Sequence, residues 1–195
     1  MFNQKKEKVM KKLMMIAVMI MAAVGVNAQN EVGQFSLMPK AGINIANVTK
    51  ADNAKSKIGL AVGVEAAYGV AKNFELTAGL LYSMQGAKAD GTDAKINMDY
   101  LNIPILAQYY LIKGLAVKAG VQVGFNTSAK VKIGDESADI DGKKSVDFSI
   151  PVGLSYEIAN VVLDARYNIG MTKMFEGADS KNSVIQITLG YKFPF

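Results

Sequence analysis

The last segment of the chain alternates strictly between apolar and polar residues. One face carries Ile185, Ile187, Leu189, Tyr191, Phe193 and Phe195, and the other carries Gln186, Thr188, Gly190 and Lys192. A period of two indicates a β-strand with one face in an apolar medium. Aromatic residues near the end of such a strand are typical of the interface girdles of transmembrane barrels. The segment therefore predicts a membrane-spanning barrel strand.

Eight segments in all show this alternation, and no sustained helical stripe follows Ala28. They are Leu37–Thr49, Ile58–Val70, Phe74–Gly86, Lys95–Leu111, Leu115–Lys130, Ser145–Ile158, Val161–Phe175 and Ser183–Phe195. The connections alternate between turns of two or three residues and longer polar loops, one of which is Val131–Lys144. Short turns at one end and long loops at the other are typical of outer-membrane barrels. We therefore predict an all-β fold, an eight-stranded antiparallel up-and-down transmembrane β-barrel with both termini in the periplasm.

The N-terminal segment indicates export. Five lysines precede an apolar stretch from Leu13 to Val26, and Val26-Asn27-Ala28 has the small residues of a cleavage site. The alternative, a membrane anchor, needs about 20 apolar residues, and this stretch is shorter. We predict a signal peptide at residues 1–28 and one barrel domain at 29–195. The leader also carries most of the net charge of +5, so the remaining chain is nearly neutral and gives no reason to expect nucleic-acid binding.

The two faces of the predicted strands differ in charge. The face expected to contact lipid carries residues such as Leu60, Val121 and Leu154, and none of its members is charged. The opposite face carries four basic and four acidic residues, which are Lys40, Glu65, Glu75, Lys118, Glu157, Asp164, Arg166 and Lys192. Unpaired buried charge is costly, so we predict that these eight residues form a paired network in the lumen. Such a network can be an ion path or a packed polar plug, and the narrow interior of eight strands favours the plug.

Three finer expectations concern the lumenal face. Arg166 is expected to lie among the four carboxylates of the network. The many glycines on this face, such as Gly63 and Gly120, are expected to make room for long side chains. Pro104 and Pro151 lie inside predicted strands and are expected to mark bulges or kinks, since proline removes a ladder donor.

The composition argues against several kinds of chemistry. The chain contains neither Cys nor His, so the usual nucleophile activation and the commonest metal ligand are lacking. Asp139-Ile140-Asp141-Gly142 is similar to part of a Ca²⁺ loop, but Ser137 and Phe148 fall at its first and last ligand positions. We therefore expect no catalytic residues, no metal and no cofactor, and we expect the protein not to be an enzyme.

Several stretches resemble a family of small outer-membrane β-barrels common in Bacteroidetes, called porin-family or PorT-like proteins. They are Lys40-Ala41-Gly42-Ile43-Asn44, Leu80–Ala87, Tyr100–Leu106, Asp164–Gly170 and Leu189–Phe193. The resemblance covers Met38 to Phe195 and implies an eight-stranded barrel in the outer membrane. It is specific for the fold and unspecific for function.

The expected role is structural or interactive, through extracellular loops in the cell envelope. A PorT-like secretion component and a narrow small-solute channel are the alternatives. We expect a monomer that contacts outer-membrane lipid and lipopolysaccharide. Its C-terminal strand, ending at Phe195, is expected to engage the barrel-assembly machinery.

Overall fold

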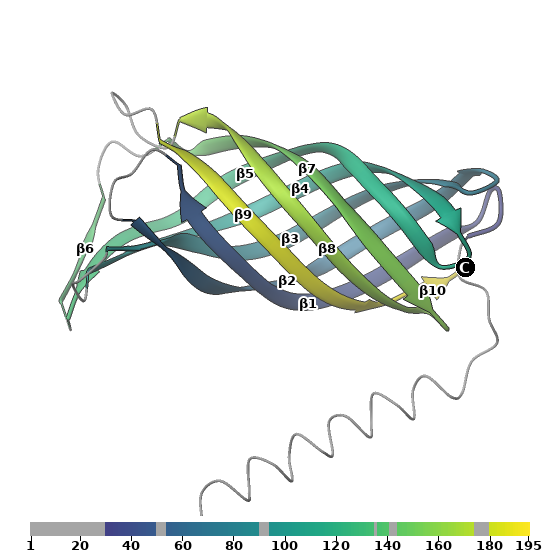
Figure 1. Ribbon diagram of the computed structural model, residues 1–195, viewed down its shortest axis with the longest axis horizontal. Coiled ribbons are helices and arrows are strands. Elements are labelled where there is room, and N and C mark those ends of the chain that lie inside the picture. Colours follow the sequence, from purple (N-terminus) through teal and green to yellow (C-terminus); the bar gives the residue numbers. More distant parts are fainter. Residues whose placement is uncertain (1–29, 50–53, 90–93, 135, 141–143, 174–179) are drawn as a thin grey trace, which may run out of the picture.

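The computed structural model describes residues 30–49, 54–89, 94–134, 136–140, 144–173 and 180–195. The predicted signal peptide at residues 1–28 lies outside the described residues, as do parts of the long loops. All regular secondary structure in the described ranges is β (Figure 1). Among these residues no helix is long and apolar enough to cross a membrane.

Eight long strands form the wall of the barrel. They are β1 (Phe35–Val48), β2 (Ala54–Ala71), β3 (Phe74–Ala89), β4 (Ala94–Ile112), β5 (Leu115–Ile133), β7 (Val146–Ile158), β8 (Val161–Lys173) and β9 (Lys181–Tyr191). Each strand pairs antiparallel with its neighbour, and β9 pairs with β1 from Lys40↔Gly190 to Val48↔Asn182, which closes the sheet. The predicted eight-stranded antiparallel barrel is therefore confirmed (Figure 1).

Two short strands add to this wall. After Lys192, β10 (Phe193–Pro194) continues beside β1, and the backbone N–H of Phe195 donates to the Phe35 carbonyl at 2.8 Å. At the other end of the barrel, β6 (Glu136–Asp139) pairs with the end of β5. The sequence predicted a loop throughout Val131–Lys144, and this was wrong for the described part. β5 continues to Ile133 and folds back as a hairpin beyond the barrel wall (Figure 1).

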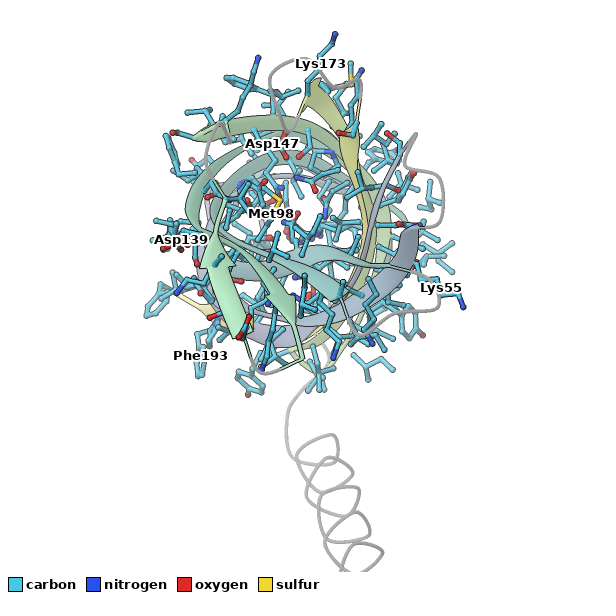
Figure 2. All side chains as sticks on the ribbon, turned by 90° about the vertical axis from the view of Figure 1, so that its left-hand side faces the viewer. Lys55, Met98, Asp139, Asp147, Lys173 and Phe193 are labelled. Carbon is cyan, nitrogen blue, oxygen red and sulfur yellow. The ribbon has the colours of Figure 1, made fainter. Side chains whose placement is uncertain are left out.

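The alternation of faces follows the prediction. On β2, Leu60 is 61% exposed and Ala61 is 1% exposed, and on β7 Leu154 is 52% exposed and Ser155 is 3% exposed. Exposed apolar side chains cover the outside of the wall, which fits a lipid environment. Polar and charged side chains are buried inside, as the view along the barrel shows (Figure 2).

The short connections are two-residue hairpin turns. Ile158 pairs with Val161 across Ala159 and Asn160, whose φ angles are both positive at 46° and 69°. Two positive φ angles define the type I′ turn, whose twist matches that of a hairpin. These tight turns hold one end of the barrel, here called the turn end, and the opposite end is called the loop end.

The lumenal glycines act differently from the prediction. A Cβ at Gly63 would collide with the Leu80 carbonyl and lie 2.6 Å from the Leu81 Cα. A Cβ at Gly120 would similarly collide with the backbone of Ile105. At these positions glycine permits close approach of the neighbouring strand's backbone, because any Cβ would force the strands apart. The expectation that they make room for long side chains is wrong here.

Pro104 and Pro151 are buried on the lumenal face, but neither coincides with a register shift in the described strand pairings. The β3–β4 pairing skips Pro104 and resumes with the same offset, while Pro104 stays paired with Gln122 on β5. Pro151 is likewise skipped by the β5–β7 pairing and paired with Asn168 on β8. The expected bulges are therefore wrong, whereas the alternative, a kink, stays a prediction. Each proline turns the side that lacks an N–H toward a local gap in one ladder.

Candidate functional site

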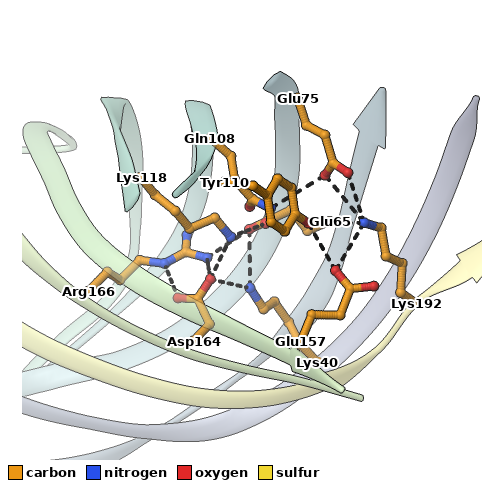
Figure 3. A network of polar contacts seen from close by, with 10 residues as sticks. All are labelled: Lys40, Glu65, Glu75, Gln108, Tyr110, Lys118, Glu157, Asp164, Arg166 and Lys192. Carbon is orange, nitrogen blue, oxygen red and sulfur yellow. Dashed lines mark hydrogen bonds and ion pairs between the residues drawn. The ribbon is translucent and has the colours of Figure 1, made fainter. Parts of the chain in front are cut away.

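The structure places all eight charged residues predicted for the lumen inside the barrel. Each is at most 4% exposed, and each takes part in an ion pair with another member; they are Lys40, Glu65, Glu75, Lys118, Glu157, Asp164, Arg166 and Lys192. Figure 3 shows that they divide into two groups at different places along the lumen.

The first group, here called the central ion cluster, contains Lys40, Glu65, Lys118, Asp164 and Arg166. Arg166 Nη2 lies 2.9 Å from Glu65 Oε2, and Arg166 Nε lies 2.8 Å from Asp164 Oδ1. Lys118 Nζ lies 2.6 Å from Asp164 Oδ2 and 3.2 Å from Glu65 Oε1. Lys40 Nζ contacts the same two carboxylates at 3.3 and 3.4 Å. Members come from β1, β2, β5 and β8, so the cluster links distant parts of the wall across the lumen.

The second group, here called the turn-end ion cluster, contains Glu75, Glu157 and Lys192. Lys192 Nζ lies 3.0 Å from Glu75 Oε1 and 3.2 Å from Glu157 Oε2. The Tyr110 hydroxyl donates to Glu157 Oε2 at 2.9 Å, and the backbone N–H of Asn30 donates to Glu75 Oε1 at 2.6 Å. The segment that precedes β1 thus contributes to this cluster.

The prediction for Arg166 is therefore half correct. Arg166 binds Glu65 and Asp164, whereas Glu75 and Glu157 bind Lys192. Glu75 and Glu157 lie one residue from a strand end at the short turns, whereas Arg166 lies five residues inside β8. Their different heights along the barrel keep them in separate clusters.

Charge is balanced between the two clusters. The central ion cluster has three cations and two carboxylates, and the turn-end ion cluster has one cation and two carboxylates. The eight side chains are therefore neutral as a set. Charge-assisted hydrogen bonds of this kind offset the cost of removing the ions from water.

Uncharged polar side chains fill the lumen on the loop-end side of the central ion cluster. Asn44 Nδ2 donates to Ser83 Oγ at 2.9 Å, and Gln186 Nε2 donates to Asn44 Oδ1 at 3.0 Å. Gln122 Nε2 donates to Ser149 Oγ at 3.1 Å. These bonds connect β1, β3 and β9, and separately β5 and β7, so the polar network continues beyond the charges.

The loop end of the lumen is partly apolar. Met98 points inward there and packs in a buried cluster whose other members are Val48, Ala87, Tyr100 and Ala129 (Figure 2). Sequence reasoning missed this cluster, and it also missed Tyr110 and Asn30 at the turn end. The signal for Tyr110 was present, because it shares the inward parity of Gln108 on β4. Asn30 precedes the first strand and has no such pattern.

The described residues hold no group of three or more His, Cys, Asp or Glu side chains arranged for a metal ion. In both ion clusters every carboxylate is bound to at least one cation. This arrangement suits mutual neutralisation and cross-linking of the wall.

A closed barrel with an apolar exterior and a charge-paired interior defines an integral outer-membrane β-barrel protein. The family model described as outer membrane protein beta-barrel domain matches residues 24–176, which is well over half of the chain. The chain therefore belongs to this family of outer-membrane proteins. No curated protein sequence matches it.

Solved structures agree on the fold. The attachment invasion locus protein Ail of Yersinia pestis is 18% identical and matches 84% of this chain and 100% of its own, with a TM-score of 0.54. Neisserial surface protein A is 15% identical and matches 82% of this chain and 97% of its own, with a TM-score of 0.55. At these identities the likeness concerns the small outer-membrane barrel fold alone.

Proposed function

We propose that this outer-membrane protein is a monomeric, non-enzymatic barrel whose lumen is plugged by its own side chains and whose loop end makes the contacts in the envelope. The central ion cluster is the observation that carries this proposal. It joins four strands by ion pairs between side chains that are at most 4% exposed. The interior of an eight-stranded barrel is only wide enough for such side chains.

Conductance in planar bilayers tests the plug. The purified wild-type protein is expected to give little or no steady conductance, because ion passage requires breaking the cluster. Stable, ion-selective openings whose selectivity changes in Arg166→Ala would overturn the plug and support a channel.

The narrow channel is the second candidate because two atoms of the ion clusters are unpaired. Within the described part of the chain, buried Arg166 Nη1 and Glu157 Oε1 have no hydrogen-bond partner. Polar atoms of this kind are consistent with a wet path beside the ion pairs. The PorT-like secretion role is the remaining alternative, and its support is the sequence resemblance alone.

We further propose that the loop end faces the outside of the cell and that both termini lie in the periplasm. Short periplasmic turns and long extracellular loops are the common arrangement of such barrels. Asp139 on β6 is exposed at the loop end, and Lys113 is exposed in the β4–β5 turn. Asp139→Cys should react with an impermeant thiol reagent on intact cells, and Lys113→Cys should not. Reversed labelling would refute the orientation.

A further inference from the structure

The turn-end ion cluster is short of one positive charge. Glu75 and Glu157 both bind Lys192, at 3.0 and 3.2 Å, and among the described residues Lys192 is the cation paired with either carboxylate (Figure 3). Tyr110, which donates a hydrogen bond to Glu157, is an uncharged partner. The excess positive charge of the central ion cluster lies at a different height in the barrel. The turn-end ion cluster therefore holds one buried negative charge that needs a nearby cation.

One atom marks where a donor is missing. Glu157 is 4% exposed, and within the described part of the chain its buried Oε1 atom has no hydrogen-bond partner. Its other carboxylate oxygen accepts from both Tyr110 and Lys192. Buried polar atoms in folded proteins are almost always hydrogen-bonded. The free oxygen therefore indicates that a donor from outside the described residues reaches this cluster.

The segment that precedes β1 leads into the same cluster. The backbone N–H of Asn30 donates to Glu75 Oε1 at 2.6 Å, and the Asn30 side chain donates to Ser36 Oγ at 3.0 Å. Asn30 is only 7% exposed. The first described residue therefore has its backbone nitrogen against a lumenal carboxylate.

This segment is held in place by the end of β2. The Gly33 N–H donates to the Gly69 carbonyl at 2.8 Å, and the Gly69 N–H donates to the Gln34 carbonyl at 3.0 Å. A Cβ at Gly69 would collide with the Glu31 carbonyl, so glycine at this position permits the close approach of the segment. These contacts fix the direction in which Asn30 enters the turn-end ion cluster.

Covalent geometry limits where the preceding nitrogen can lie. The predicted cleavage after Ala28 makes Gln29 the first residue of the mature chain, and its α-nitrogen is one peptide unit from the nitrogen of Asn30. Standard bond lengths separate consecutive backbone nitrogens by about 3–4 Å. Because the Asn30 nitrogen is 2.6 Å from Glu75 Oε1, the α-nitrogen of Gln29 is within about 6 Å of this carboxylate. Opposite charges interact strongly over such a distance.

We propose that the α-ammonium group created at Gln29 by signal-peptide cleavage is the second cation of the turn-end ion cluster. Hydrolysis of the Ala28–Gln29 peptide bond by a signal peptidase consumes one water and gives the Ala28 carboxylate and the Gln29 amine. The amine is protonated at neutral pH, whereas the same nitrogen in the precursor is an uncharged amide. Cleavage therefore neutralises the cluster and completes the turn end of the plug. The inference rests on the plug proposed above and on the predicted cleavage site.

The chain's own terminus is favoured over a soluble metal ion as the second cation. The anchored segment brings its α-nitrogen to the cluster without the cost of capturing a free ion. An ammonium group also donates hydrogen bonds, which suits the unpaired Glu157 Oε1. The described residues, in addition, contain no group of acidic side chains arranged for a metal ion.

The stability of two N-terminal forms in micelles tests the proposal. The predicted mature chain, residues 29–195, is released from a cleavable fusion with a free Gln29 amine. Glutaminyl cyclase converts this amine to uncharged pyroglutamate, and mass spectrometry confirms the loss of ammonia. The cyclised form is expected to have an unfolding equilibrium constant about tenfold higher, since a hydrogen bond to a charged group is lost.

Variants of the acidic residues locate the effect. Glu157→Gln removes the excess negative charge, so its free and cyclised forms should be equally stable. Glu75→Gln is a second variant in which the difference should vanish, and the test therefore does not depend on the folding of one variant. Glu31→Gln removes an exposed acidic group from the same segment and is the matched control, in which the tenfold difference should persist. Each variant is compared with its own cyclised form, so that its intrinsic stability cancels.

Three results would overturn the proposal. Equal stability of the two wild-type forms would show that the ammonium group has no partner. A tenfold difference that persists in both Glu157→Gln and Glu75→Gln would place its partner outside the cluster. Replacement of sodium by choline at constant ionic strength, if it weakened the free-amine form as much as cyclisation does, would assign the second cation to a metal ion. Conductance is not measured in these experiments, so failure of the plug as a barrier to ions is distinguishable from failure of this inference.

Discussion

Arg166 on β8 meets Glu65 on β2 at 2.9 Å across the interior of the barrel, although β1 and β9 separate the two strands in the wall. Both side chains are buried, at 2% and 0% exposure. The ion pair is therefore a cross-link through the lumen and not a contact between neighbouring strands.

Removal of a carboxylate from the central ion cluster should lower the free energy of unfolding more than removal of Arg166. Asp164→Asn leaves three cations facing Glu65 alone, whereas Arg166→Ala leaves two lysines facing two carboxylates. Breaking a buried pair so that charge is left uncompensated costs about 3–5 kcal/mol, and we expect Asp164→Asn to approach this loss. Urea unfolding in micelles, followed by heat-modifiability gels, measures the difference. A larger loss in Arg166→Ala would contradict this account of the charge balance.

The assignment of faces predicts opposite outcomes for neighbouring residues on β5. Val121 is 58% exposed on the outer wall, and Gln122 is 5% exposed in the lumen. Val121→Arg places a charge in lipid and should lower the free energy of unfolding by about 2–4 kcal/mol. Gln122→Arg keeps the new charge in the polar interior and should be milder. Folded yield in bilayer vesicles compares them, with Val121→Leu as the control, and equal effects of the two arginines would refute the assignment.

The close approach of strands at Gly120 predicts a steric penalty there. A Cβ at this position would meet the backbone of Ile105 and Leu106, whereas at Gly190 it would meet the flexible Met38 side chain. Gly120→Ala should therefore be destabilising by about 1–3 kcal/mol, in the range of overpacked interiors. Gly190→Ala is the matched control with a smaller loss, because Met38 can change rotamer. Thermal unfolding of both variants in the same micelles gives the comparison.

Much of this fold could be predicted from the sequence because a strand with one wet face has a period of two. The parity of Leu60 and Glu65 alone assigned them to opposite faces. Strand ends were less predictable. β2 starts at Ala54 and not at the predicted Ile58, because the polar residues Lys55 and Ser56 pair beyond the apolar belt.

The partners of the lumenal charges could not be predicted in the same way. The alternation along each strand places Arg166 and Glu75 on the lumenal face. It does not give their positions along the barrel axis, because these depend on the stagger between strands. The register of all strands decides that Arg166 meets Glu65 and that Lys192 meets Glu75. The alignment of Lys55, Lys88, Lys95 and Lys132 was hidden for the same reason, since these residues become neighbours only once three strand pairs are in register.

The C-terminal residue offers a test of the expected assembly partner. The Phe195 N–H donates to the Phe35 carbonyl, and the two rings lie 6.2 Å apart, yet Phe195 remains 76% exposed. Its removal therefore deletes one hydrogen bond and one aromatic contact at the edge of the barrel and leaves the closing β1–β9 pairs intact. Refolding of the truncated protein in micelles should be nearly normal.

Assembly in cells is the second measurement. If the assembly machinery recognises this terminal residue, the amount of folded barrel in outer-membrane fractions should fall severalfold, measured by heat-modifiability gels. Phe195→Tyr, which keeps the aromatic ring, is the control and should assemble like the wild type. Equal outer-membrane levels of the truncated and wild-type proteins would remove Phe195 from the recognition of this strand, and a parallel loss in micelles would assign the defect to the stability of the barrel itself.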